Sequence, residues 1–398
     1  MKILWVKSDF LHPSTRGGRI RTLEILKCLH ARHEIHYVAF LYPDQPGALA
    51  RCPEYCTRAY PVPLHLPGKR SPAFFVQLAA AVFSPLPLAV SRYRSRRMER
   101  LVSSLRNKHR FDAVVCDFLT PAPNIADLSG CVLFEHNVET AIWQRHLEHA
   151  AGPLRRLYFG LQARRMAALE RRVCRQVKHI IAVSEIDAAL IRSWFDASHV
   201  TVVPTGVDLD FFAPPPGSSP AADLVFVGSM DWMPNIDGVS YFVREVLPLI
   251  RRRYPSCTLV IAGRNPAPEI RAMAAHDPRI RVTGTVDDIR PFLWGSSVSI
   301  VPLRVGGGTR LKIYESMAAR VPLVSTSVGA EGLDVRSPDH FLLADSPETF
   351  AQACLELLDS PTRRSQLAQS AWHSITSRFS WQHIASRFEQ VLERNSDP

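Results

Sequence analysis

Short apolar runs alternate with segments of helical spacing along most of the chain. In the first half these runs cover residues 2–7, 35–41, 113–116, 131–135 and 180–184, and in the second half residues 224–228, 258–263, 280–284, 298–303 and 323–326. Strands that are buried on both faces and separated by helices are typical of parallel sheets in doubly wound α/β domains. Because one such domain usually takes about 100–200 residues, the pattern predicts two of them in a chain of 398 residues.

A proline-rich stretch at residues 213–220, with the sequence APPPGSSP, interrupts this alternation near its middle. Proline and glycine at this density cannot continue a helix or a central strand, so we predict a linker or hinge there. Two doubly wound domains joined in this way would face each other across a cleft. Ligands of this fold bind outside the carboxyl ends of the strands.

A glycine-rich loop follows the run at 298–303 and leads into a segment of helical spacing. The loop and the start of that helix contain Gly306, Gly307, Gly308, Thr309, Arg310, Lys312 and Glu315. Backbone N–H groups at the N-terminus of a helix form an anion site that suits a diphosphate, and Thr309 can cap this helix. Arg310 and Lys312 add two cations, and Glu315 can accept hydrogen bonds from ribose hydroxyls. The alternative is a plain strand–turn–helix junction with a surface Arg–Glu pair.

Residues 201–395 resemble the nucleotide-binding half of the retaining GT-B glycosyltransferases of family four, the glycogen-synthase-like group. The segments that carry the resemblance are VPTGVD at 203–208, the strand and glycine turn at 225–230, IAG at 261–263, ESMA at 315–318 and VGAEG at 328–332. The resemblance implies two Rossmann-like domains: an N-terminal acceptor-binding domain over residues 1–204 and a C-terminal nucleotide-sugar-binding domain over 205–378. It also implies a closing helix at 379–398 that crosses back to the first domain.

The first half matches this family more loosely. Gly17 and Gly18 follow the first strand, where the family has a glycine loop near the donor phosphates and the acceptor. His136 stands where the family carries a histidine near the transferred sugar. The alternative for His136 is a histidine at a strand end that a backbone carbonyl satisfies.

Together the motifs and the resemblance give a list of expected site residues. The expected donor-binding residues are Gly17, Gly18, Gly228, Ser229, Gly263, Arg264, Gly306, Gly307, Gly308, Thr309, Arg310, Lys312 and Glu315. The expected catalytic residues are His136, Arg310 and Lys312.

Two departures from the family pattern affect the donor site. Gly307 stands where the family usually has the first of two glutamates, of which Glu315 is the second. Ser229 and Asn235 stand where the family often has Arg and Lys to hold the diphosphate. We therefore expect Arg310 and Lys312 to supply that positive charge.

The resemblance implies a retaining glycosyltransferase that moves a sugar from a UDP- or GDP-linked donor to a glycan or lipid-linked acceptor in bacterial cell-surface polysaccharide synthesis. We expect no metal ion and no cofactor, because cations already neutralise the diphosphate. Two alternatives stay open: a nucleotide-sugar epimerase of GT-B architecture, and an inactive nucleotide-sugar-binding or scaffold protein.

The net charge of +11 is unevenly distributed, since residues 1–200 hold 29 Lys and Arg against 16 Asp and Glu, and residues 201–398 hold 19 against 21. A basic surface favours anionic partners, although a solvated basic surface explains the charge equally well. An apolar segment at 72–83, followed by arginines between 92 and 100, suits a membrane interface or a lipid-phosphate acceptor; the alternative is an ordinary core helix followed by a solvated one. We expect an anionic membrane surface as a partner, and no nucleic acid, because aromatic platforms and a recognition-helix motif are lacking.

The sequence also suggests a compartment. It contains no run of about 18 or more apolar residues, and its first residues have the pattern of a strand and not of a signal peptide. The eight cysteines fit buried free thiols. We expect a cytoplasmic protein, associated peripherally with the inner face of the plasma membrane if it binds lipid.

Overall fold

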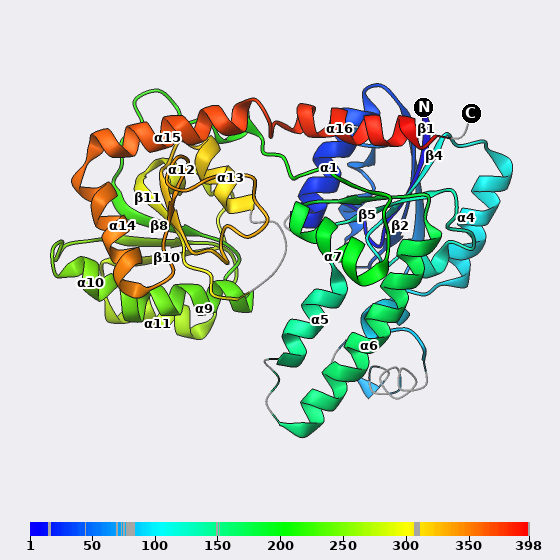
Figure 1. The fold of residues 1–398 in the computed structure, drawn as a ribbon, viewed down its shortest axis with the longest axis horizontal. Helices are drawn as coiled ribbons and strands as arrows, with labels where there is room; N and C mark the ends of the chain where they lie inside the picture. Colours follow the sequence, from blue (N-terminus) through cyan, green and yellow to red (C-terminus); the bar gives the residue numbers. More distant parts are fainter. Residues whose placement is uncertain are drawn as a thin grey trace. The chain divides into compact units, whose positions relative to one another are not determined.

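The computed structural model describes residues 1–398 except 15–16, 44, 69–70, 73, 75, 77–83, 149, 151, 306–310 and 397–398. The chain forms two compact units, unit 1 with Met1–Thr205 and Trp381–Pro398, and unit 2 with Gly206–Ser380. Each unit is a sheet of parallel strands covered by helices (Figure 1). This is the doubly wound α/β architecture that the alternating pattern predicts.

The proline-rich stretch at 213–220 lies inside unit 2, so the prediction that it links the two domains is wrong. The chain passes between the units after Thr205 and again before Trp381. Both flanks of the proline-rich stretch are hydrogen-bonded to unit 2: the Trp294 indole N–H donates to the carbonyl of Phe212 at 2.9 Å, and the amide of Ala221 donates to the carbonyl of Gly295 at 2.8 Å. These bonds fasten the stretch to the surface of one unit.

The described part of unit 1 contains a seven-stranded sheet in the order β3-β2-β1-β4-β5-β6-β7. Its strands are β1 (Lys2–Val6), β2 (Glu34–Leu41), β3 (Arg58–Pro63), β4 (Ala113–Asp117), β5 (Cys131–Glu135), β6 (His179–Ala182) and β7 (Val200–Val202). The order reverses between β1 and β4, which makes that point the topological switch where ligands bind in such sheets.

The helices of unit 1 cover both faces of this sheet. They are α1 (Gly17–His30), η1 (Pro46–Ala48), η2 (Cys52–Glu54), α3 (Leu88–Ser91), α4 (Arg96–Lys108), η3 (Ala122–Asn124), α5 (Glu139–Glu148), α6 (Pro153–Gln176), α7 (Glu185–Phe195) and α16 (Trp381–Arg394). The last of these, α16, packs against α1. Its Phe388 ring stacks on Trp5 at a centroid distance of 5.5 Å and meets Phe134 edge-on at 5.0 Å. The last helix of the sequence therefore completes the core of unit 1.

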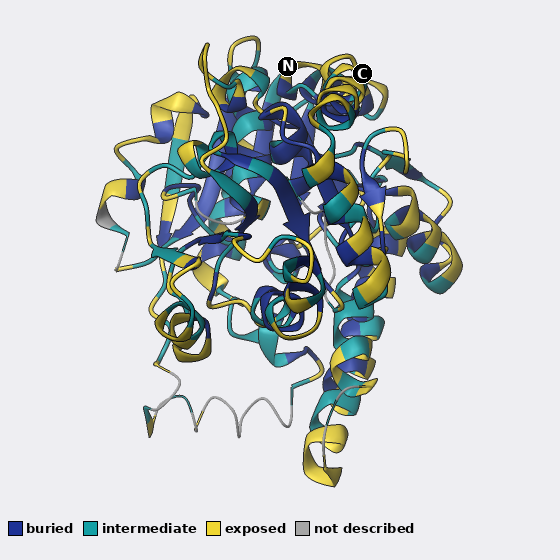
Figure 2. Ribbon diagram, turned by 90° about the vertical axis from the view of Figure 1, so that its left-hand side faces the viewer, coloured by how far each residue is buried: buried dark blue, intermediate teal, exposed yellow. Residues whose placement is uncertain are grey.

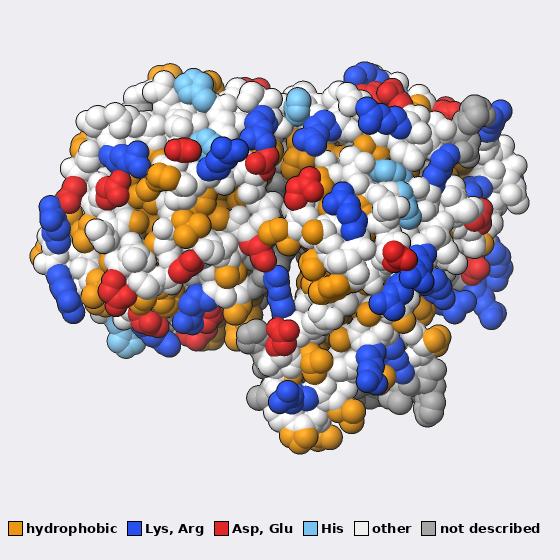
Figure 3. All heavy atoms as spheres, viewed as in Figure 1, with side chains coloured by type: hydrophobic (Ala, Val, Ile, Leu, Met, Phe, Trp, Pro, Cys, Tyr) orange, Lys and Arg blue, Asp and Glu red, His pale blue; other side chains and the backbone are white. Residues whose placement is uncertain are grey.

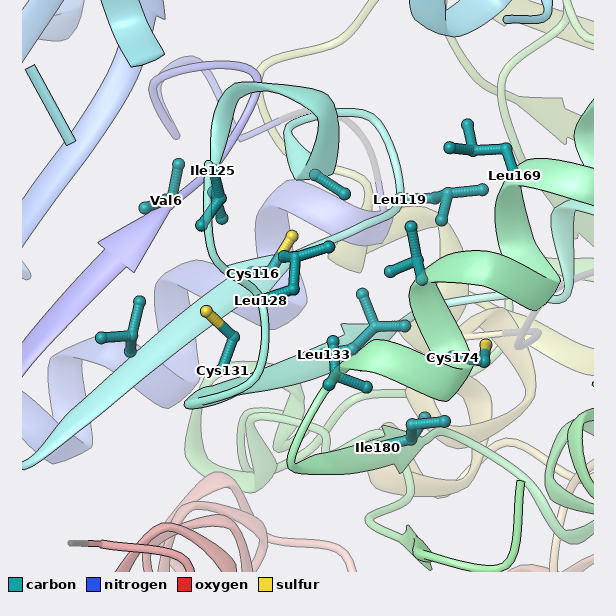
Figure 4. Close-up of a cluster of buried hydrophobic side chains, with 14 of the residues drawn as sticks. Val6, Cys116, Leu119, Ile125, Leu128, Cys131, Leu133, Leu169, Cys174 and Ile180 are labelled. Atoms are coloured by element: carbon teal, nitrogen blue, oxygen red, sulfur yellow. The ribbon is translucent and has the colours of Figure 1, made fainter. Parts of the chain in front are cut away.

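The core on the other face of this sheet is built from aliphatic side chains and thiols. Figure 4 shows Val6, Cys116, Leu133 and Ile180 from the strands in one cluster with Leu169 and Cys174 of α6. The central strands are buried and the outer faces of the helices are exposed (Figure 2). All eight cysteines are free, and every one except Cys28 is buried. The prediction of buried free thiols is therefore confirmed for Cys116, Cys131 and Cys174 and is wrong for Cys28, which is partly exposed.

The described part of unit 2 contains a six-stranded sheet in the order β10-β9-β8-β11-β12-β13. Its strands are β8 (Ala222–Val227), β9 (Leu259–Ala262), β10 (Ile280–Gly284), β11 (Ser296–Val301), β12 (Leu323–Ser325) and β13 (Leu342–Leu343). Its helices are α8 (Leu209–Phe212), α9 (Met233–Tyr241), η4 (Phe242–Val246), α10 (Leu247–Arg251), α11 (Pro268–His276), α12 (Arg290–Trp294), α13 (Leu311–Ala318), α14 (Pro347–Asp359) and α15 (Pro361–Thr376). The strand order of unit 2 reverses between β8 and β11.

None of the helices in the described part of the chain combines the length and the apolarity that a bilayer span requires. The apolar segment predicted at 72–83 lies mostly outside the described residues.

Candidate functional site

The carboxyl ends of β8 and β9 approach each other closely in unit 2. The Gly228 amide donates to the carbonyl of Ala262 at 3.0 Å. A Cβ atom on Gly263 would lie 1.7 Å from the carbonyl oxygen of Gly228, which no side chain can tolerate. Glycine is therefore required at Gly263, because only a residue without a side chain lets the two strand ends approach this closely.

Lys312 extends from α13 to the glycine turn after β8. Its ammonium donates to Asn235 Oδ1 at 2.9 Å and lies 4.2 Å from the centre of the Phe226 ring. Asn235 in turn donates from Nδ2 to the carbonyl of Ser229 at 2.8 Å. A Cβ atom on Gly228 would approach the Lys312 ammonium to 2.8 Å. The lysine can therefore occupy this position only because residue 228 has no side chain. The predicted site residues Gly228, Ser229 and Lys312 are thus brought together.

A second cation reaches the same turn from the loop after β9. Arg264 donates from Nε to Ser229 Oγ at 2.8 Å, and Ser229 Oγ donates to Asp231 Oδ1 at 2.6 Å. The hydrogen bonds from Ser229 and Asn265 lower the pKa of the Asp231 carboxyl. Arg264 therefore brings a positive charge to the turn in which Ser229 stands at a position where the family often has a basic residue.

Glu315 lies one turn after Lys312 on α13 and is half-buried. Burial raises the pKa of its carboxyl to about 7, although the positive charge of Lys312 acts to lower it. Near neutral pH the carboxyl group is therefore divided between its charged and neutral forms.

Five predicted residues, Gly306, Gly307, Gly308, Thr309 and Arg310, lie outside the described residues. Their roles, including the catalytic role of Arg310, stay predictions.

In unit 1, charged and polar side chains gather where β1 and β4 end, at the switch point. The Lys7 ammonium donates to Asp117 Oδ1 at 2.6 Å. The other carboxylate oxygen, Asp117 Oδ2, accepts from the Trp5 indole at 2.8 Å and from Thr22 Oγ1 at 2.7 Å. Asp117 is fully buried, and despite this burial the pKa of its carboxyl is held well below the usual range by Lys7 and His136. The cluster is thus a satisfied buried ion pair.

His136 completes this cluster through both of its ring nitrogens. Nε2 lies 2.8 Å from Asp117 Oδ1, and Nδ1 lies 2.9 Å from Arg21 Nη1. A guanidinium can only donate, so Nδ1 accepts and Nε2 carries the proton that it donates to Asp117. Burial lowers the pKa of His136 to about 3, and the ring stacks on Phe118 at 3.9 Å. The partners of His136 are side chains, and not the backbone carbonyl of the alternative interpretation.

Gly17 and Gly18 begin α1, next to this cluster. A Cβ atom on Gly18 would lie 2.9 Å from the Phe118 ring and 3.7 Å from His136 Nδ1. Gly18 therefore lets the helix start close to the histidine. Lys7, Arg21 and Asp117 were not predicted as site residues. Lys7 and Asp117 stand at the ends of buried strands, and Arg21 lies within α1, so the sequence signals them only as charged residues near apolar ones.

Among the described residues, no group of three or more His, Cys, Asp or Glu side chains could hold a metal ion. A pair of buried acids does lie beside His136. Glu135, at the end of β5, is fully buried, and burial together with Glu170 raises the pKa of its carboxyl well above the usual range. Glu170 accepts from the amides of Glu139 and Thr140 at 2.9 and 2.8 Å, so it caps the start of α5.

Comparison with protein families decides the identity of the chain. Residues 15–211 match the family model described as "Glycosyltransferase Family 4", and residues 221–360 match "Glycosyl transferases group 1". The chain belongs to the group 1 glycosyltransferases of family four. This confirms the resemblance drawn from the motifs, and with it the GT-B fold of two Rossmann-like domains.

Relatives of this glycosyltransferase include an uncharacterized 44.6 kDa protein in the cps region of Klebsiella pneumoniae, 21% identical over 99% of this chain and 100% of the relative. A GDP-mannose-dependent alpha-(1-6)-phosphatidylinositol monomannoside mannosyltransferase of Mycobacterium tuberculosis is 27% identical over 49% of this chain and 56% of its own length. Among solved structures, the Anabaena protein Alr3699/HepE in complex with UDP-glucose has a TM-score of 0.68 at 13% identity, covering 99% of this chain and 100% of that one. At this identity the likeness shows the fold alone.

Proposed function

We propose that this glycosyltransferase moves a sugar, with retention of anomeric configuration, from a UDP- or GDP-linked donor to a glycan or lipid-linked acceptor in cell-surface polysaccharide synthesis. The observation that carries the proposal is the convergence of Lys312, Arg264 and Asn235 on the Gly228–Ser229 turn. Support also comes from the cps-region relative and from the mannosyltransferase, whose name gives a nucleotide-sugar donor and a lipid acceptor.

The chemistry assigned to unit 2 is stabilisation of the leaving group. When the sugar departs, negative charge develops on the diphosphate, and fixed cations beside it lower the barrier. Lys312 and Arg310 take this role, and Arg264 orients the turn through Ser229 Oγ. Glu315 accepts hydrogen bonds from the ribose hydroxyls. Because cations neutralise the diphosphate, the proposed reaction needs neither a metal ion nor a cofactor.

The chemistry assigned to unit 1 is positioning. His136 is neutral at physiological pH and has both ring nitrogens engaged, so it does not transfer a proton as an acid or a base in this arrangement. Instead, the Asp117–His136–Arg21 chain fixes the backbone after β5, where the family has its contact to the transferred sugar. The acceptor hydroxyl then attacks from the side of the leaving group, and a donor phosphate oxygen takes its proton.

The test is a thermal-unfolding screen of the whole chain with UDP, GDP and their sugars. A ligand at a hundredfold excess over its dissociation constant stabilises the native state by about 2.7 kcal/mol, which raises Tm by several degrees. Lys312→Met keeps the aliphatic stem over Phe226 but removes the charge. A charge-assisted hydrogen bond is worth about 1.5–3 kcal/mol, so we expect nucleotide affinity to fall roughly ten- to hundredfold.

Arg252→Gln, at an exposed position of the same unit, is the matched control and should bind normally. If none of the nucleotides or nucleotide sugars raised Tm, the result would favour the inactive scaffold protein. A changed nucleotide sugar formed without any acceptor would favour the epimerase instead.

A further inference from the structure

The α5–α6 hairpin of unit 1 projects beyond the sheet (Figures 1 and 2). Its outer end carries exposed apolar side chains. Leu154, Leu157 and Leu161 have exposed fractions of 81%, 72% and 39%. At positions i, i+3 and i+7 of α6 they form one stripe on the helix surface. Exposed leucines that line up in this way mark a contact surface and not scattered surface residues.

The hairpin is anchored at its base. Glu170 of α6 caps the first amides of α5, and Gln162 Oε1 accepts from the amide of Leu88 at 2.8 Å. Farther out, Phe159 of α6 packs on His146 and Trp143 of α5 at centroid distances of 5.6 and 6.2 Å. The two helices therefore hold each other through their aromatic residues, while the leucine stripe points away from this contact.

Arginines surround the stripe. Residues 153–165 contain Arg155, Arg156, Arg164 and Arg165 and no acidic residue. Arg155, Arg156 and Arg164 are exposed. Figure 3 shows the mixture of hydrophobic and basic side chains at the end of the projecting hairpin. The surface formed by Leu154, Arg155, Arg156, Leu157, Leu161 and Arg164 is called the hairpin tip below.

We propose that the hairpin tip docks on a bilayer that contains anionic phospholipid, with its leucines among the acyl chains and its arginines at the headgroup phosphates. Leu154 and Leu161 are seven residues apart, which is about 10 Å along a helix. Interfacial helices lie in the plane of the membrane surface and bury their apolar faces by about 5–10 Å, so the stripe can enter the boundary along its whole length. Arg155, Arg156 and Arg164 lie beside the leucines along the same stretch of α6, within reach of the headgroup phosphates. The proposal does not rest on the transferase activity, because lipid binding is measured without donor.

A second copy of this chain fits the hairpin tip less well. Two tips would bring the arginines of one copy against those of the other, and Glu148 at the end of α5 is the one exposed acid among the described residues next to them. A stable protein interface also takes about 20–30 residues on each side, whereas the stripe offers three leucines.

The experiment is co-sedimentation of the full chain with vesicles of phosphatidylcholine, with and without phosphatidylglycerol. We expect binding only to the anionic vesicles and loss of binding at high salt. A basic residue at an anionic surface strengthens binding about fivefold, so Arg155→Gln with Arg156→Gln should weaken it about 25-fold. Leu154→Gln with Leu157→Gln should weaken it at least tenfold, since each leucine loses its apolar burial.

Matched controls are Arg244→Gln with Arg252→Gln for charge and Ile186→Gln for an exposed apolar side chain, and these should bind as the natural chain does. Equal vesicle binding by all variants would overturn the proposal. So would a leucine variant that abolishes self-association and leaves lipid binding unchanged, or binding to nucleic acid but not to lipid. The nucleotide-induced shift in Tm should persist in every tip variant. If lipid binding were intact but no nucleotide shifted Tm, the result would count against the proposed function and not against the docking surface.

Discussion

Gly228 and Gly263 lie against each other in unit 2, yet a methyl group would meet different atoms at each. On Gly263 it would meet the backbone carbonyl of Gly228 at 1.7 Å. Backbone cannot move aside without breaking the β8–β9 pairing. We therefore expect Gly263→Ala to lower the free energy of unfolding by roughly 3 kcal/mol or more, measured by urea denaturation. Stability within about 0.5 kcal/mol of the natural chain would show that the close approach is not formed in solution.

On Gly228 a methyl group would meet Asn235 Nδ2 at 2.7 Å and the Lys312 ammonium at 2.8 Å, the far ends of two flexible side chains. These can move away, so Gly228→Ala should cost only about 1 kcal/mol of stability. It should still weaken nucleotide binding at least tenfold, because Lys312 is displaced. Titration calorimetry with the nucleotide identified by the thermal screen measures this. Unchanged affinity would remove Lys312 from the donor site.

Because His136 is buried, we expect the free energy of unfolding to depend on pH. Its pKa is lowered to about 3 in the folded chain from an ordinary value of 6.5. Between these values the unfolded chain binds the proton and the folded chain does not, so stability is present above pH 6.5 and falls as the pH decreases toward 3. This one group contributes about 1.4 kcal/mol per pH unit.

His136→Gln provides the comparison, because a glutamine amide can accept from Arg21 and donate to Asp117 without titrating. Urea denaturation from pH 7 to pH 4 should give a shallower decline for His136→Gln than for the natural chain. Identical slopes would mean that the ring is protonated in the folded protein.

How much of the site could be predicted follows from how its residues are spaced in the chain. Gly228, Gly263 and Lys312 belong to continuous motifs, and a motif can be recognised in one segment. Lys7, Asp117 and His136 lie at the ends of three separate strands, and Lys7 and Asp117 are 110 positions apart. Each alone is a polar residue near an apolar run. Only the pairing of β4 with both β1 and β5 brings them together, and no local pattern encodes these pairings.

At the scale of elements, the sequence predicted the central strands and the edge strand β10, and it missed the other three edge strands. The strands without an apolar run of their own are β3, β7 and β13, and each lies at the edge of its sheet. An edge strand is covered less, so it needs fewer apolar residues: β3 contains Arg58, Pro61 and Pro63, and β13 has two residues. Proline is tolerated there because one side of an edge strand has no partner strand. The final helix was predicted from its spacing, since its buried face repeats at helical intervals.

That final helix gives a prediction of its own. Phe388 packs on Trp5 and Phe134 in the core of unit 1. Removing a buried aromatic ring costs about 3–5 kcal/mol, so Phe388→Ala should lower the stability of unit 1 by this amount. Chemical denaturation, followed by the fluorescence of the tryptophans, measures the loss. Gln390→Ala, on the exposed face of the same helix, should have little effect; a similar loss in both would indicate that the helix as a whole is disturbed.

At the scale of the whole molecule, each unit has its polar cluster where the strand order reverses, β1 and β4 in unit 1 and β8 beside β11 in unit 2. At such a point the helices on either side of the sheet diverge and leave the strand ends accessible. Fold and site position are therefore consequences of the same topology. The excess of basic residues in the first half follows no such rule. Part of it lies in the exposed arginines of the α5–α6 hairpin and part in the exposed arginines of residues 94–100.

The return of the chain to unit 1 at Trp381 has a consequence for biosynthesis. When the ribosome has made residues 1–205, the surface around Trp5 and Phe134 still lacks the ring of Phe388. Translation proceeds at about 5–20 residues per second, so that apolar surface waits for roughly ten seconds or more while the whole of unit 2 emerges. A nascent chain stalled in this interval exposes aromatic rings of the kind that chaperones bind. The first part of this protein to be synthesised is thus the last to be finished.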